Sequence, residues 1–171
     1  MKNAALTLVA IFFSLSVFAQ KYAFVDSEYI LSNIPTYASA QEQLDLLSVQ
    51  YQKEIEDIYA EIDKMYKEFQ AEKVLLTEEM RTKRENDIIN KEKVAKDLQK
   101  KYFGKEGMLY KKRQELIKPI QDEIFNAVKG LAEEGSYAVI FDSAASGASM
   151  LYTDPKYDKS DEVLSRLGYK N

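Results

Sequence analysis

Residues 51–69 read YQKEIEDIYAEIDKMYKEF, and the spacing of their apolar side chains decides the fold. Apolar residues recur at steps of three and four, at Tyr51, Ile55, Ile58, Ile62, Met65 and Phe69. This is the a/d pattern by which one helix packs along another. Leu44 extends the seam, and nothing between the candidate cap Thr36 and Leu76 breaks a helix. We expect a helix of about 40 residues, roughly 60 Å long.

A second long helix is predicted to begin at Thr77-Glu78-Glu79, a cap followed by acids in the first turn. Its apolar stripe continues to about residue 134, at Ile88, Leu98, Tyr102, Leu109, Leu116, Ile117, Ile120, Ile124, Val128 and Leu131. Gly104 and Gly107 weaken this helix by about 1 kcal/mol each, and Pro119 is expected to bend it. These three residues are the candidate hinges of the arm.

The two helices are predicted to fold back on each other near residue 77. Tyr51 would then face Tyr102 or Phe103, and Tyr66 would face Ile88. Residues 41–79 carry four lysines and eleven acids, whereas residues 80–134 carry fourteen basic residues and ten acids. Opposite charge favours this antiparallel hairpin over pairing of identical helices, although each exposed pair contributes at most about 1 kcal/mol. The alternative is two solvated helix faces.

Short apolar runs flank the hairpin and predict a small β-sheet body. Residues 22–25 (YAFV) and 137–141 (YAVIF) predict strands, and residues 150–152 (MLY) predict a third strand in a hairpin with the second. Gly135 is expected just past the long helix, and Ser160-Asp161-Glu162 is expected to cap a last helix that ends before Gly168. Asp26 and Asp142 end two strands, where they cap turns rather than form a catalytic carboxylate pair.

The predicted fold class is α+β and mostly α. A signal peptide spans residues 1–19, the body comprises residues 20–36 and 135–171, and the helical arm comprises residues 37–134. So small a sheet is barely stable alone and has open edges, so we expect several copies to join through it. The candidate residues of this oligomer body are Tyr22, Phe24, Val25, Val139, Ile140, Phe141 and Leu151.

The first nineteen residues predict export from the cytoplasm. A basic Lys2 precedes an apolar run from Ala4 to Val17, and Val17-Phe18-Ala19 predicts cleavage before Gln20. The alternative is an uncleaved anchor, but the run is shorter than the ~20 residues of a spanning helix. The predicted compartment holds no ATP.

The composition argues against an enzyme. The chain has no Cys, His or Trp, so the usual zinc ligands and nucleophile–base pairs are missing, and no cofactor is expected. No Gly-rich phosphate loop is present, and a net charge of −4 argues against nucleic acid. Carboxylate catalysis would need a walled pocket, for which a two-helix arm and a tiny sheet leave little room.

These segments, taken in order, resemble the Skp/OmpH family of periplasmic chaperones. The resemblance covers residues 21–168 and is carried by residues 22–26 (YAFVD), 118–120 (KPI), 137–142 (YAVIFD) and 161–167 (DEVLSRL). It implies a periplasmic homotrimer with helical tentacles around a cavity. It also implies ATP-independent holding of unfolded outer-membrane proteins. The family's best-known members are strongly basic and this chain is acidic, which argues against attraction to anionic lipid or lipopolysaccharide.

Two questions stay open at this point. The aromatic residues that flank the seam either contact clients or widen the hairpin core; they are Tyr59, Tyr66, Tyr102, Phe103 and Tyr110. The basic stretch at residues 100–118 either faces the acidic helix or touches a membrane surface. A structural spacer or adaptor of the cell envelope is the alternative function.

Overall fold

The computed structural model describes residues 20–145 and 150–169. They form two compact units. One unit is the hairpin, residues 34–122, and the other is the body, in which residues 20–33 combine with the described residues from 123 onward. The division between the two units falls at residue 122, whereas the sequence predicts the C-terminal end of the arm at residue 134. The predicted signal peptide lies outside the described residues.

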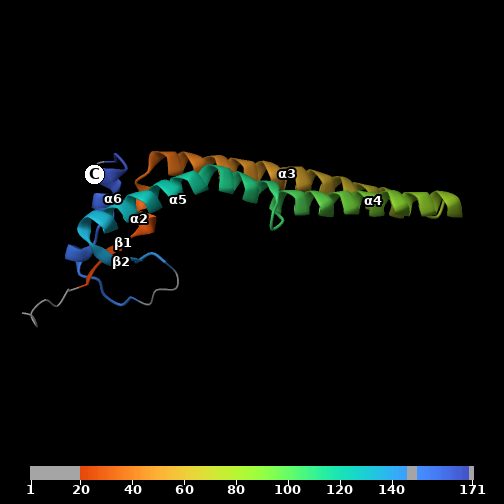
Figure 1. Cartoon of the computed structure of the whole chain (residues 1–171). Coiled ribbons are helices and arrows are strands. Elements are labelled where there is room, and N and C mark those ends of the chain that lie inside the picture. The colour runs from red at the N-terminus through yellow and green to blue at the C-terminus, as the bar shows by residue number, and fades with distance from the viewer. Residues whose placement is uncertain (1–19, 146–149, 170–171) are drawn as a thin grey trace, which may run out of the picture. The chain divides into compact units, whose positions relative to one another are not determined.

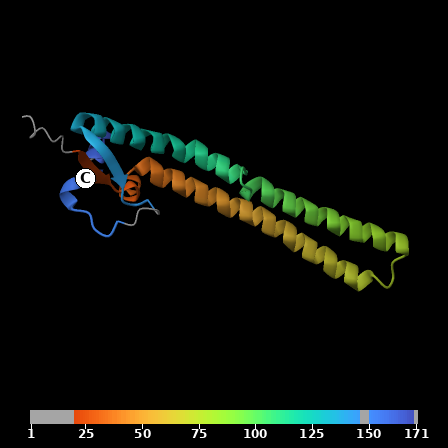
Figure 2. The same ribbon diagram turned by 60° about the horizontal axis from the view of Figure 1, so that its bottom comes forward.

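The hairpin unit contains the two long helices that the sequence predicts. Helix α3 spans Pro35–Glu72 and helix α4 spans Glu78–Phe103, and the two lie side by side along their lengths (Figures 1 and 2). Thr77 caps α4 as expected, since its hydroxyl accepts from the Met80 amide. The first helix begins two residues earlier than expected, with Ile34 rather than Thr36 as its cap and Pro35 in its first turn, where a missing N–H costs nothing.

The apolar seam is filled by side chains from both helices, as the heptad pattern predicts. One buried cluster joins Ile62, Phe69, Ile88 and Ala95. A second joins Tyr51, Ile55 and Tyr102, and Leu47, Leu98 and Leu109 pack against it. The rings of Tyr51 and Tyr102 stack with their centroids 4.0 Å apart, which confirms the predicted register at this level.

Charged side chains link the two helices in the predicted sense, with the acid on α3 and the base on α4. Lys91 Nζ lies 2.6 Å from a Glu61 oxygen, and Arg84 lies 3.5 Å from Glu72. The basic stretch at residues 100–118 does not face the acidic helix through ion pairs. Its ion pairs among the described residues run along its own helix, from Lys112 to Glu115 and from Lys118 to Asp122.

The second long helix is interrupted where the two glycines were expected only to weaken it. Helix α4 ends at Phe103, and helix α5 spans Met108–Gly135 and continues through Pro119. A Cβ on Gly104 would lie 2.3 Å from the Lys100 carbonyl oxygen, and one on Gly107 would lie 2.6 Å from that of Tyr102. The break therefore depends on glycine because the backbone approaches itself too closely for a side chain.

The body holds a two-stranded parallel sheet. Strand β1 (Lys21–Val25) pairs with strand β2 (Tyr137–Asp142). Helix α2 (Ser27–Ser32) lies against helix α6 (Ser160–Arg166), and a short 3₁₀ turn, η1 (Pro155–Tyr157), contacts β1. Ala23, Ile30, Val163 and Leu164 form its buried apolar centre. The parallel pairing reflects the long excursion of the chain between the two strands.

The two aspartates at the strand ends act as caps, as predicted. The Asp26 carboxylate accepts from the Tyr29 amide at 2.9 Å. Asp142 Oδ1 accepts from the amides of Ala144 at 3.0 Å and Ser27 at 3.1 Å. One oxygen of each carboxylate thus accepts from backbone amides, as expected of a residue that caps a turn.

The prediction of a third strand at residues 150–152 is wrong. These residues form no strand, and β1 and β2 are the strands of the described residues. Ser143 donates from its backbone amide to the Val25 carbonyl at 2.8 Å, so pairing with β1 continues one residue past the end of β2. Later in the chain, Asp158 forms the bridge to Phe24 at the other edge of β1.

Two details at the helix ends also differ from prediction. Gly135 is the last residue of α5, and Ser136 takes the left-handed conformation, at φ 54°. A Cβ on Gly135 would lie 2.2 Å from the Tyr137 ring, so the glycine makes room for that ring. At α6 the cap position belongs to Lys159, and the Ser160 amide donates to Asp158 at 2.9 Å. Gly168 does adopt a positive φ, as expected.

Candidate functional site

Four of the five aromatic candidates on the hairpin unit are exposed. Tyr59 lies on α3, Phe103 ends α4 and Tyr110 lies on α5. Tyr66, on α3, donates its hydroxyl to Glu92 at 2.9 Å, one helical turn along from the expected Ile88, and this bond raises the pKa of Tyr66. The four rings present apolar surface with a polar rim, the type of surface that adapts to varied partners.

Tyr102, the fifth candidate, lies inside the hairpin. Its side chain is only 7% exposed, stacks on Tyr51 and donates its hydroxyl to Glu54. This hydrogen bond holds the pKa of Glu54 below its ordinary value and raises the pKa of Tyr102. Tyr102 thus widens the hairpin core, the second of the two roles that the sequence left open for these aromatic residues. Its buried ring is not accessible to a client.

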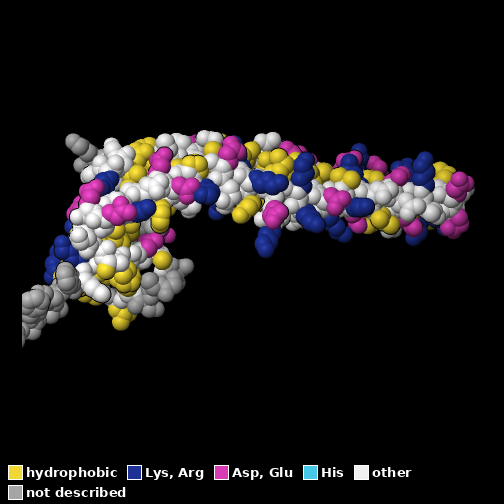
Figure 3. Space-filling model, in the orientation of Figure 1, with side chains coloured by type: hydrophobic (Ala, Val, Ile, Leu, Met, Phe, Trp, Pro, Cys, Tyr) yellow, Lys and Arg dark blue, Asp and Glu magenta, His cyan; other side chains and the backbone are white. Residues whose placement is uncertain are grey.

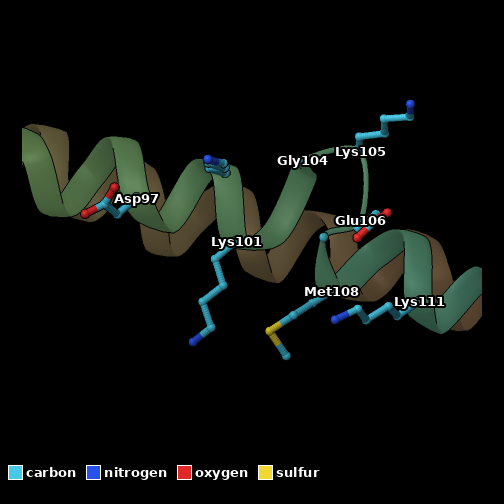
Figure 4. Close-up of a pocket in the computed structure, with 9 residues that line it drawn as sticks. Asp97, Lys101, Gly104, Lys105, Glu106, Met108 and Lys111 are labelled. Carbon is cyan, nitrogen blue, oxygen red and sulfur yellow. The ribbon is translucent and has the colours of Figure 1, made fainter.

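The helix break borders an open hollow of about 670 Å³ (Figure 4). Lysines and both glycines dominate its lining, which comprises Asp97, Lys100, Lys101, Gly104, Lys105, Glu106, Gly107, Met108 and Lys111. In the close-up, Lys101 and Met108 extend to one side of the helices and Lys105 extends to the other. So open and divergent a lining does not enclose a substrate.

The body presents an apolar sheet face to solvent. Cross-strand partners Tyr22 and Val139, and Phe24 and Phe141, alternate with the inward-facing residues. The rings of Phe24 and Phe141 stack with their centroids 5.7 Å apart, and the ring centroids of Tyr22 and Tyr157 are 5.0 Å apart. We call these five residues the outer sheet face. Packing among the aromatic rings orders this face without covering it.

The other predicted body residues are distributed differently. Val25 is buried within its own chain and Ile140 is partly buried, whereas Leu151 is fully exposed on the segment after β2. The sequence reasoning missed Tyr157, which joins the outer sheet face from η1. It also missed Val74 and Leu75, which lie between α3 and α4. The sequence could have indicated them, because they are two adjacent aliphatic residues beyond Phe69, the last residue of the apolar pattern.

The surface of the hairpin mixes both charge signs. Figure 3 shows acidic and basic side chains interspersed along it, with apolar patches between them, rather than a field of one sign. Among residues 20–145 and 150–169, no group of His, Cys, Asp or Glu side chains is arranged to hold a metal ion. No helix in the same described part is both long and apolar enough to cross a bilayer.

Comparisons with known proteins agree with this architecture. The family model described as outer membrane protein (OmpH-like) matches residues 21–167. A crystal structure from Caulobacter crescentus CB15, described as that of a candidate outer membrane chaperone (OmpH-like), superposes with a TM-score of 0.67. That match covers 86% of this chain and 83% of the other at 13% identity, so it establishes likeness of fold. Among curated proteins, no sequence matches.

Proposed function

This chain belongs to the OmpH-like family of outer membrane proteins, and we propose that it is an ATP-independent periplasmic holdase for unfolded outer-membrane proteins. The observation that carries the proposal is the hairpin, whose seam is filled by its own residues while Tyr59, Tyr66, Phe103 and Tyr110 stay exposed. The hairpin needs no further helix to cover that seam. Its flanking aromatics can therefore make weak, reversible contacts with another chain.

The proposed mechanism is multivalent contact rather than binding in a pocket. An unfolded client offers many weak apolar and polar contacts, and several arms in one assembly raise the local concentration of contact sites. Contacts in the millimolar range then sum to tight holding. Release needs no nucleotide when the client gains more free energy by folding into a membrane. No residue of this chain is proposed to catalyse a reaction.

We propose that the assembly is a homo-oligomer, with the family's trimer as the expected state. The support comes from the body, where the outer sheet face leaves Tyr22, Val139 and Phe141 exposed while Phe24 and Tyr157 are half-buried. A second copy would bury these side chains and cover the outer edge of β2, which has no strand partner among the described residues. A face this apolar is a typical subunit contact.

The proposed function is tested by diluting a urea-unfolded outer-membrane β-barrel protein into buffer with the mature chain. At near-stoichiometric ratio we expect the chain to keep the client soluble, with light scattering at the level of a client-free sample. Replacing Tyr59 and Tyr110 with Ser should weaken this protection. Phe125→Ser is the matched control, because Phe125 is an exposed aromatic residue of the body. Aggregation at the rate of unprotected client would refute the holdase.

An envelope spacer remains the second candidate, since a long hairpin could set a distance between two fixed partners. The break between α4 and α5 argues against it, because a rigid spacer gains nothing from an interrupted helix. Crosslinking in cells separates the two functions. A spacer gives one dominant partner, whereas a holdase gives many.

A further inference from the structure

The turn that joins the two long helices lies at the end of the hairpin (Figures 1 and 2). It carries exposed aliphatic side chains. Val74 and Leu75 are each 86% exposed. The next residue, Leu76, packs against the buried cluster that contains Ile62 and Phe69. One of three consecutive aliphatic residues therefore anchors the turn, and the other two remain in solvent. We call Val74 and Leu75 the apolar tip.

Hydrogen bonds and an ion pair hold this turn in one conformation. The Leu75 amide donates to the Glu72 carbonyl at 2.8 Å. Arg81 Nε donates to the Lys73 carbonyl at 2.9 Å, and Arg84 pairs with Glu72. These bonds fix the backbone on both sides of the apolar tip. The exposure of its two side chains is thus a property of an ordered turn and not of a frayed helix end.

Charges around the apolar tip cancel. Residues 72–85 contain four acids (Glu72, Glu78, Glu79 and Glu85) and four bases (Lys73, Arg81, Lys83 and Arg84). An anionic lipid surface attracts segments with a clear excess of Lys and Arg, which is missing here. A stable interface with a folded protein buries about 800 Å² per partner, far more than two side chains offer. The surface instead fits a narrow, uncharged and apolar partner.

We propose that Val74 and Leu75 form a contact site for apolar segments of an unfolded polypeptide. An extended segment whose apolar and polar residues alternate, as in the strands of a membrane β-barrel, presents an apolar side chain at every second residue on one face. Two adjacent aliphatic side chains can therefore engage it without a groove. The inference rests on the proposed holdase function and adds a place of contact to it. In an oligomer each copy contributes one apolar tip, and the weak contacts add.

The test measures binding of a fluorescently labelled outer-membrane β-barrel protein, diluted from urea, by anisotropy with the full mature chain. V74S/L75S is expected to raise the apparent Kd about tenfold, as loss of two partly buried aliphatic contacts does. The matched control is L46S/V49S, which removes two aliphatic side chains on the flank of α3 that are 65% and 69% exposed. It is expected to change the Kd by less than about twofold.

A gain-of-contact variant makes the test independent of any loss of folding. V74F/L75F enlarges the apolar tip and is expected to lower the apparent Kd about threefold. Circular dichroism should show unchanged helix content in all three variants, because each replaced side chain is exposed.

Several results would overturn the inference. If the parent binds the client and V74S/L75S binds equally well, or if L46S/V49S loses as much affinity, the apolar tip has no special role and the holdase stands. If the parent itself fails to bind, the proposed function and the inference fall together. Loss of sedimentation with phosphatidylcholine vesicles in V74S/L75S alone would make the tip a membrane contact. A lower sedimenting mass for that variant would make it a contact between copies.

Discussion

The hairpin and the body bury their apolar residues in opposite ways. In the hairpin, α3 and α4 supply both sides of one seam, and side chains such as Phe69 and Ile88 are covered within a single chain. In the body, β1 and β2 cover one face of the sheet and leave Tyr22 and Phe141 exposed on the other. The difference indicates that the hairpin's stability is local, whereas the body leaves apolar surface that the proposed assembly would cover.

The strongest test of a self-contained seam is to open a cavity in it. Phe69→Ala is expected to lower the free energy of unfolding by about 3–5 kcal/mol, because Phe69 is buried against Ile62 and Ile88. Urea unfolding followed by circular dichroism measures the loss. Tyr59→Ala is the control, with an expected loss under about 1 kcal/mol since its ring is exposed. Equal losses would show that the seam is not the hairpin's core.

A charge placed on the outer sheet face of the body should weaken self-association without unfolding the body. Phe141→Asp places a charge on the outer sheet face and is expected to weaken self-association about tenfold or more. Sedimentation equilibrium reports this as a lower mass at the same concentration. Phe125→Asp makes the same change at another exposed phenylalanine of the body and should leave the mass unchanged. A parent chain that is already monomeric contradicts the proposed assembly.

The sequence predicts the hairpin well because its determinants are local. A three- and four-residue period between Ile55 and Phe69 specifies a helix, and Thr77 marks the next helix start. Strand pairing depends on residues far apart, and this is where prediction failed. Residues 150–152 have the composition of a strand, but composition does not specify a pairing partner, and these residues form no strand.

The candidate site was predictable only as a set of residue types. Spacing placed Tyr59 and Tyr102 near the seam, but it could not say which ring the seam would bury. Burial of Tyr102 depends on stacking with Tyr51 and on the reach of its hydroxyl to Glu54, which only the register of the two helices determines. The helix break likewise depends on a close backbone approach at Gly104 and Gly107. Helix propensity marks both glycines as weak points but does not predict that one helix ends there and another begins.

The hydrogen bond from Tyr102 to Glu54 makes the stability of the hairpin depend on pH on the acid side. It lowers the pKa of Glu54 below the ordinary 4.5, so its stabilisation is present above pH 4.5 and is lost as the pH falls through the lower folded value. In Tyr102→Phe the pKa of Glu54 should move up toward 4.5, and the acid-side loss of stability should become shallower. Carboxyl NMR titration and melting temperatures between pH 3 and 6 measure both effects.

The control for this pH effect is Tyr59→Phe, which removes an exposed hydroxyl from the same helix pair and keeps the Glu54 contact. Its pH profile should match that of the parent. An unchanged Glu54 titration in Tyr102→Phe would instead mean that Gln50, which also donates to Glu54, sets the pKa.

The smallest expected effect concerns the ion pairs that join α3 to α4. Lys91→Glu places two acids together at Glu61 and is expected to cost about 0.5–1 kcal/mol, because both side chains are partly solvated. The double variant E61K/K91E should recover most of that loss. The difference in stability between Lys91→Glu and the parent should shrink in 1 M salt, because salt screens the interaction between the two charges. Lys53→Glu, in a pair within α3, is the control for a general charge effect. If the double variant recovers nothing, the charge pattern does not select the antiparallel partner, and the apolar seam alone determines which helix pairs with which.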